Sequence, residues 1–278
     1  MFEQVFVILR GRTTRHAIAF TISRATDSLE FLNCFPVLAC TSRTGKDVPM
    51  STELDLLPES TQRLVRTVDG LTDEQWGEPS ALPGWTRGHV VAHVTLNAEG
   101  LAEVLRGVAR GEAVPMYPSQ EARDDGIAEL AAADPAMVRE RFLASGTRFL
   151  DAFGQVPDDM WSATVERVPG GRVFPASAVL GMRLREVEIH HVDLDAGYAQ
   201  ADWPPAFSAL VIDAMTVRGA AQQPFVAHAT DLDRSWSFGD GGPTVTGAAA
   251  DLAWWLTGRG NGENLTSNDG VLPGIETW

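Results

Sequence analysis

The chain has 278 residues, enough for one large domain or two smaller ones, and its hydrophobic content of 44% is that of an ordinary globular protein. Its formal net charge of −15 argues against nucleic acid and anionic membranes as partners, because both would be repelled. A small anionic substrate remains compatible with this charge only where arginines gather at its site. With no apolar run near the roughly 20 residues of a membrane span and no signal-peptide pattern, we expect a cytoplasmic protein.

The first 49 residues differ from the rest of the chain. They hold six basic residues against four acidic ones, the only lysine and both cysteines, Cys34 and Cys40. Because "MSTELDLLPES" from Met50 resembles a natural start, we expect residues 1–49 to be a non-native or disordered extension. A genuine β segment at "FEQVFVILR" is the weaker alternative, since nothing obvious pairs with it. Any thiol chemistry in the body of the chain must therefore come from a small molecule.

Helical patterns with short links begin after Met50. The first predicted helix starts near Pro58 and ends at Gly70. A short helical turn follows, with Thr72 as its cap and Trp76 pointing inward.

The next predicted helices are longer. One is capped by Thr86 and ends near Gly111, a second region spans residues 119–153 with a break at 134–135, and a last one covers 177–195. Short links between helices favour antiparallel neighbours, so residues 50–198 are predicted to form a four-helix bundle.

The pattern changes after Tyr198. "ADWPP" interrupts it, a helix is expected at 207–218, and the short runs "FVAHAT", "RSWSFG" and "PTVTG" are typical of strands. With a closing helix in "AAADLAWWLTGRG", we predict a small α/β domain over residues 199–278. The expected fold class is mostly α with this α/β domain at the C-terminal end.

Ionisable residues crowd the last bundle helix, in "REVEIHHVDLDAGY". On a helical wheel, Glu186 and His190 lie one turn apart on the inward apolar face, whereas Glu188 points to solvent and His191 lies on the flank. The first pair is either a Glu–His contact that stabilises the helix or two ligands of one metal ion. Asp193 either orients a ligand or is a surface residue near the helix end.

A third candidate ligand comes from the long helix "GWTRGHVVAHVTLN". There His93 lies closer to the apolar stripe than His89 does, although a lone histidine can equally be a hydrogen-bonded core residue. Together, His93, Glu186 and His190 would leave a fourth position of a metal open, as in catalytic sites.

Four motifs, "LPGWTRGHVVAHV", "PMYPSQEARDDGI", "MRLREVEIHHVDL" and "TGRG", resemble in this order the mycothiol-dependent maleylpyruvate isomerases, over about residues 54–278. The resemblance implies a DinB-like bundle, a domain similar to sterol carrier protein, and divalent-metal ligands, normally to zinc, at His93, Glu186 and His190. It also implies a functional arginine at Arg259, for which a helix C-cap is the structural alternative. Trp85, Trp254 and Trp255 either line a cleft or pack in the core.

The implied activity is the isomerisation of maleylpyruvate to fumarylpyruvate in gentisate breakdown, part of aromatic catabolism. The cofactor mycothiol adds its thiolate to the double bond, rotation follows, and elimination returns the thiol. The metal stabilises the thiolate, and Arg259 pairs with a substrate carboxylate or the enolate. The alternatives are a mycothiol S-transferase acting on electrophiles and a non-enzymatic DinB-like protein.

Overall fold

The computed structural model describes residues 3–10, 15–22, 51–219 and 221–276. The chain divides into two units, Met1–Val48 and Pro49–Trp278. In the first unit, β1 (Glu3–Arg10) pairs antiparallel with β2 (Arg15–Ile22), so the expectation that nothing pairs with this segment is wrong. The remainder of the expected extension lies outside the described residues, and its non-native origin stays a prediction.

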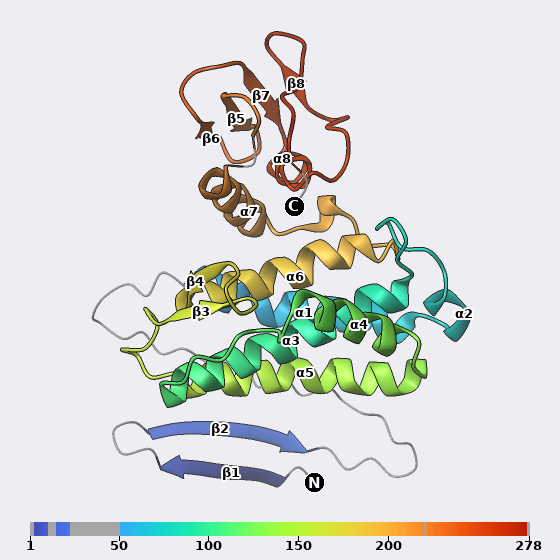
Figure 1. The fold of residues 1–278 in the computed structure, drawn as a ribbon, viewed down its shortest axis with the longest axis vertical. Coiled ribbons are helices and arrows are strands. Elements are labelled where there is room, and N and C mark those ends of the chain that lie inside the picture. Colours follow the sequence, from blue (N-terminus) through green and yellow to red (C-terminus); the bar gives the residue numbers. More distant parts are fainter. Residues whose placement is uncertain (1–2, 11–14, 23–50, 220, 277–278) are drawn as a thin grey trace. The chain divides into compact units, whose positions relative to one another are not determined.

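Within the described part of the second unit, four long helices form a bundle, with two shorter helices beside them (Figure 1). α3 packs against α4, α5 and α6, and α1 packs against α6, so α6 has a long neighbour on two of its faces. The helices are α1 (Ser51–Gly70), α2 (Asp73–Trp76), α3 (Arg87–Arg110), α4 (Gln120–Ala131), α5 (Pro135–Gln155) and α6 (Val179–Asp193).

Local sequence explains where α3 begins and ends and where α5 begins. The Thr86 side chain accepts a hydrogen bond from the His89 backbone N–H at the start of α3, and Gly111 ends this helix at a φ of 70°. At the start of α5, Asp134 accepts hydrogen bonds from two backbone N–H groups, and Pro135 occupies the first turn. Both predicted helix starts are confirmed.

Two features of the bundle differ from the sequence prediction. α1 begins at Ser51, so Pro58 lies inside the helix and not in its first turn. A proline there removes a backbone hydrogen bond, but the buried Leu57 and Leu64 hold the helix against the bundle on both sides of it. The hairpin of β3 (Thr164–Glu166) and β4 (Val173–Pro175) was not predicted, because three-residue strands carry almost no alternation pattern.

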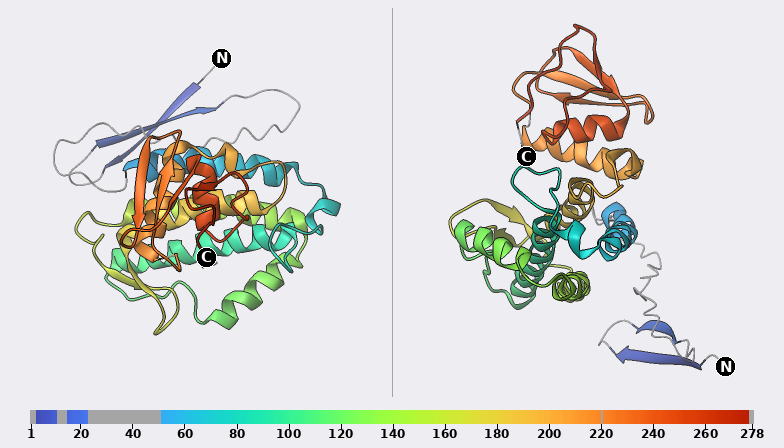
Figure 2. Two further views of the ribbon diagram at one scale, coloured as in Figure 1. Left: turned by 90° about the horizontal axis from the view of Figure 1, so that it is seen from above. Right: turned by 90° about the vertical axis from the view of Figure 1, so that its right-hand side faces the viewer.

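The C-terminal region contains a four-stranded mixed sheet in the order β6-β5-β7-β8. β5 runs antiparallel to β6 and parallel to β7, and two helices cover one side of the sheet (Figure 2). The predicted α/β fold class is confirmed, although the short β8 was not foreseen. The elements are α7 (Pro205–Arg218), β5 (Phe225–Ala229), β6 (Arg234–Phe238), β7 (Thr244–Gly247), α8 (Ala249–Leu256) and β8 (Thr266–Ser267).

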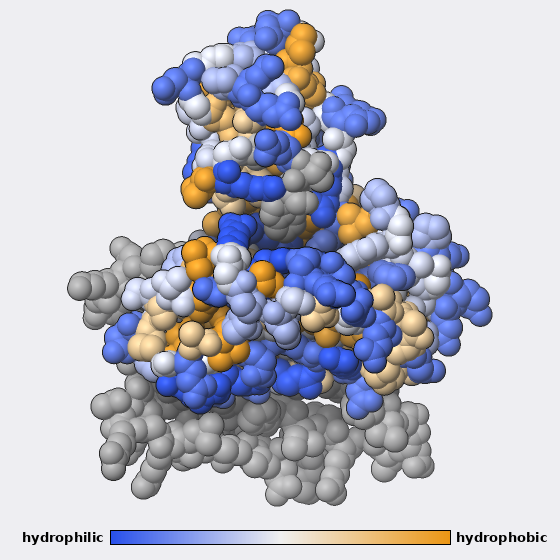
Figure 3. All heavy atoms as spheres, in the orientation of Figure 1, coloured by the Kyte–Doolittle hydropathy of each residue, from blue (hydrophilic) through white to orange (hydrophobic). Residues whose placement is uncertain are grey.

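Apolar side chains are concentrated inside the bundle. Leu101, Val104 and Leu105 of α3 are fully buried, which makes this helix the centre of the core. Hydrophilic residues cover much of the face drawn in Figure 3, with hydrophobic ones scattered among them. None of the helices in the described ranges has the length and apolarity needed to cross a membrane.

Candidate metal centre

Three side chains from α3 and α6 converge inside the bundle. His93 Nε2 lies 2.9 Å from Glu186 Oε2 and 3.1 Å from His190 Nε2, and His190 Nε2 lies 3.2 Å from Glu186 Oε2. Zinc binds such atoms at about 2.0–2.1 Å, which places the ligands of a tetrahedral ion roughly 3.4 Å apart. The three atoms therefore fit around one ion with little rearrangement. Across the described residues, no other His, Cys, Asp or Glu group of this kind was found.

Helix geometry and burial account for this convergence. Glu186 and His190 are four residues apart on α6, so their side chains lie on one face and meet His93 from α3. Both histidines are buried, and the indole of Trp85 packs edge-on against His93 with ring centroids 5.6 Å apart. The structure thus brings together the three residues selected from the sequence, in a site shielded by aromatic packing.

Asp193 connects this group to the C-terminal region. His190 Nδ1 lies 2.8 Å from Asp193 Oδ2, and Arg259 donates from Nε and Nη2 to the two carboxylate oxygens at 2.9 and 2.8 Å. Asp193 is only 1% exposed, so its interpretation as a surface residue is wrong. A carboxylate behind a ligating imidazole fixes the ring and its proton, and Arg259 in turn fixes that carboxylate.

Burial and neighbouring charges shift the pKa values of the three converging residues in different directions. Burial lowers the pKa of His93 to about 4, although the Glu186 charge opposes this shift. Burial also acts on His190, but hydrogen bonds with Asp193 and Glu186 outweigh it and raise the pKa of His190 above its ordinary value. Burial alone would raise the pKa of Glu186, yet the two imidazoles hold it well below the usual range. An ionised carboxylate beside a neutral His93 is the state that a cation requires.

The other side of α6 is buried as well, contrary to expectation. Glu188, predicted to face solvent, is fully buried, and His191, predicted on the flank, is 1% exposed. The prediction is wrong because α1 covers this face, and a wheel of one helix cannot show a second neighbour. The Glu188 carboxylate accepts hydrogen bonds from Ser60, Arg63 and Tyr198.

Sequence reasoning did not single out Arg123, which lies in the quoted motif "PMYPSQEARDDGI". From α4, its Nη2 reaches within 3.2 Å of His93 Nδ1. A signal was present, since an arginine between acidic residues in a strongly acidic chain is a candidate for a specific contact. Of the tryptophans, Trp254 lies 5.7 Å beneath the Arg259 guanidinium, whereas Trp255 is buried and packs in the C-terminal core.

Residues 57–195 match the model of the "Mycothiol maleylpyruvate isomerase N-terminal domain", and residues 202–277 match that of the "MDMPI C-terminal domain". The chain belongs to the mycothiol maleylpyruvate isomerase family. The resemblance found in the sequence motifs is thereby confirmed.

Two solved structures are similar to this chain over most of its length. The crystal structure of the mycothiol-dependent maleylpyruvate isomerase is 32% identical, covers 83% of this chain and 97% of its own, and has a TM-score of 0.73. That of a histidine-to-alanine mutant of the mycothiol-dependent maleylpyruvate isomerase is 31% identical, with the same coverage and a TM-score of 0.73. A search of curated proteins finds no match.

Proposed function

We propose that the protein catalyses the mycothiol-dependent cis–trans isomerisation of maleylpyruvate to fumarylpyruvate, a step of the gentisate pathway. The observation that carries the proposal is the convergence of His93, Glu186 and His190, in a family whose name specifies this reaction. Because the chain has no cysteine beyond Cys40, the thiol must be supplied by a small molecule.

His93, Glu186 and His190 would hold a divalent ion, which we propose to be zinc. When bound, such an ion supplies a Lewis acid that stabilises a thiolate at neutral pH. Mycothiol would supply the thiol, whose reversible addition makes the substrate's double bond single and free to rotate. Asp193 keeps the proton of His190 on Nδ1, so that Nε2 presents its lone pair to the ion.

Arg259 is the residue that we propose for binding the substrate's negative charge. The Asp193 carboxylate lies between its guanidinium and His190, and the guanidinium lies over the ring of Trp254. An acidic chain must offer a local positive charge to a diacid, and a guanidinium carries five N–H donors, so that Arg259 can hold Asp193 through Nε and Nη2 and still donate to a substrate oxygen. Arg259 would thereby orient the diacid while it holds Asp193 in place.

The proposal is tested by following the absorbance of maleylpyruvate with purified protein, with and without mycothiol, after the metal content has been measured. We expect stoichiometric zinc, conversion only with the thiol, and loss of conversion in Arg259→Ala. Absence of thiol-dependent conversion contradicts the isomerase. Conjugation of mycothiol to an electrophile without isomerisation would instead support the S-transferase.

A further inference from the structure

The two histidines at the metal centre have opposite partners on their outer nitrogens. His190 Nδ1 faces a carboxylate oxygen of Asp193 at 2.8 Å, whereas His93 Nδ1 faces Nη2 of Arg123 at 3.2 Å. A carboxylate accepts a hydrogen bond and a guanidinium only donates. The two imidazole rings are therefore held as different tautomers, with the proton on Nδ1 in His190 and on Nε2 in His93.

The consequence for each ring follows from counting protons. In neutral His190, a proton on Nδ1 leaves the lone pair of Nε2 directed at the group of ligand atoms. In neutral His93, Nδ1 must accept from Arg123, so the proton sits on Nε2, where it points at Glu186 Oε2 2.9 Å away. His93 cannot ligate through Nε2 while Arg123 donates to its Nδ1.

We propose that Arg123 is a positioning residue that opposes metal binding by His93, and that its guanidinium leaves Nδ1 when His93 takes a metal. The inference rests on the proposed metal-binding role of this site. Arg123 thus sets how tightly the site holds its ion, in contrast to Asp193, which favours ligation by His190. A weakly held third ligand leaves the ion more electron-poor and better able to stabilise a thiolate.

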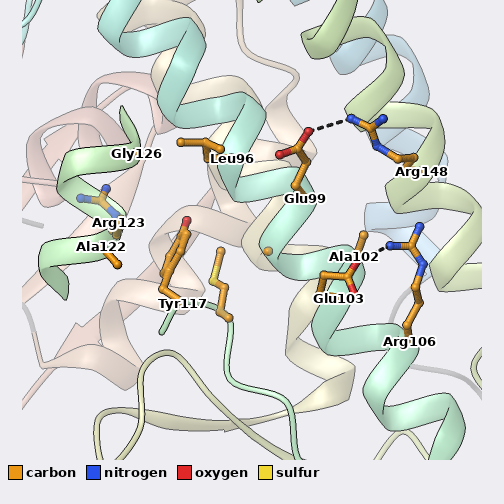
Figure 4. A pocket seen from close by; sticks show the side chains of 12 residues that line it. Leu96, Glu99, Ala102, Glu103, Arg106, Tyr117, Ala122, Arg123, Gly126 and Arg148 are labelled. Atoms are coloured by element: carbon orange, nitrogen blue, oxygen red, sulfur yellow. Dashed lines mark hydrogen bonds and ion pairs between the residues drawn. The ribbon is translucent and has the colours of Figure 1, made fainter. Parts of the chain in front are cut away.

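The surroundings of Arg123 allow the proposed movement. Its side chain lines a cavity of about 360 Å³ bounded by α3, α4 and α5, together with Met116 and Tyr117 from the link between α3 and α4 (Figure 4). Its Nη1 already pairs with Asp124 at 2.7 Å on the outer side of α4. The cavity provides the space into which we expect the guanidinium to turn when it leaves His93.

The test compares zinc affinities by titrating zinc-loaded protein with a chromophoric chelator. Arg123→Met removes the donor and retains an unbranched stem, and we expect zinc to be held at least about tenfold more tightly, within the usual range for outer-shell changes. The matched control is Arg167→Met, because Arg167 also lies near the Tyr117 ring, at 5.7 Å, but its guanidinium donates to Gln120. This control removes the same charge and should change the affinity far less.

A second measurement follows the proton of His93 directly. Nitrogen-15 NMR of the protein after zinc removal should show the proton on Nε2 in the wild type and a shift toward Nδ1 in Arg123→Met. Equal affinity changes in both variants, weaker zinc binding in Arg123→Met, or a wild-type proton on Nδ1 would each overturn the inference while leaving the proposed function intact. A wild type that binds no zinc would overturn both.

Discussion

The two faces of α6 each carry a glutamate and a buried histidine, and they differ in what surrounds them. On the face toward α3, Glu186 and His190 meet another imidazole, and the three atoms crowd within 3.2 Å of one another. On the face toward α1, Glu188 is surrounded by donors, including Arg63 Nη2 and the Tyr198 hydroxyl, both at 2.6 Å.

The partners of a carboxylate separate a structural residue from a candidate metal ligand. Glu188 is saturated by groups that donate to it, so its charge is satisfied within the protein. Glu186 faces imidazole nitrogens that are themselves ligand atoms, and one shared proton cannot satisfy all three of them. The residue types and the helix are the same, and only the partners assign the roles.

Glu186→Gln tests the face of α6 toward α3 and has the largest expected effect on zinc affinity. A neutral amide keeps the shape but loses the charge, so zinc affinity should fall by more than about a hundredfold, beyond the effect of an outer-shell change. Metal analysis after dialysis measures the loss, and thermal unfolding of the zinc-free protein checks that the variant still folds. Retention of stoichiometric zinc would contradict the assignment.

Glu188→Gln should give the reverse pattern. It breaks the ion pair with Arg63, and loss of one partner of a buried pair destabilises by roughly 3 kcal/mol. Urea unfolding measures this change, and zinc content should stay at the wild-type level. The distinction between the faces fails if this variant loses its metal while it keeps its stability.

Asp193→Asn should weaken zinc binding by about 10–100-fold, because an amide no longer requires the proton of His190 to lie on Nδ1. The affinity is measured by competition with a chelator. Asp195→Asn serves as the control, since it removes the same charge from an exposed position nearby. Equal losses in the two variants would show that only the net charge matters.

His191→Phe has the smallest expected effect and tests the second face through pH. Burial, with a contribution from the Arg63 charge, lowers the pKa of His191 to about 3, whereas an unfolded histidine titrates at about 6.5. Between these values the unfolded chain binds more protons, so wild-type stability falls as the pH falls from about 6.5 toward 3.

The phenylalanine variant loses the contact between His191 Nε2 and Thr67 Oγ1, at 2.7 Å, and should be less stable by about 1 kcal/mol above neutral pH. This gap should close and then reverse by about pH 5, because the wild type loses roughly 2 kcal/mol there through the acid-sensitive contribution that the variant lacks. Urea unfolding at two pH values measures it. A gap that stays constant would contradict a buried, neutral His191.

The features predicted correctly are those encoded within a few residues. Thr86 and Gly111 delimit α3 through caps that involve only near neighbours, and the spacing of Glu186 and His190 places them on one face. The missed features depend on distant segments. The burial of Glu188 depends on residues of α1, and the sequence around Glu188 does not indicate that α1 packs there.

The same distinction holds at the metal centre. His93 was selected because it lies near an apolar stripe, which is a local property, but its contact with Arg123 spans 30 residues. The pairing of Arg259 with Asp193 spans 66. The family resemblance selected Arg259 as a functional residue, but it did not indicate which atoms the guanidinium would hold.

The contact between Arg259 and Asp193 bears on how members of this family can be recombined. Asp193 lies in the segment that matches the N-terminal family model, and Arg259 lies in the segment that matches the C-terminal one. A chimera that joins the bundle of this chain to the C-terminal domain of a relative would inherit the proposed metal ligands, His93, Glu186 and His190, from the first parent alone. The orientation of one of those ligands, His190, would depend on the second.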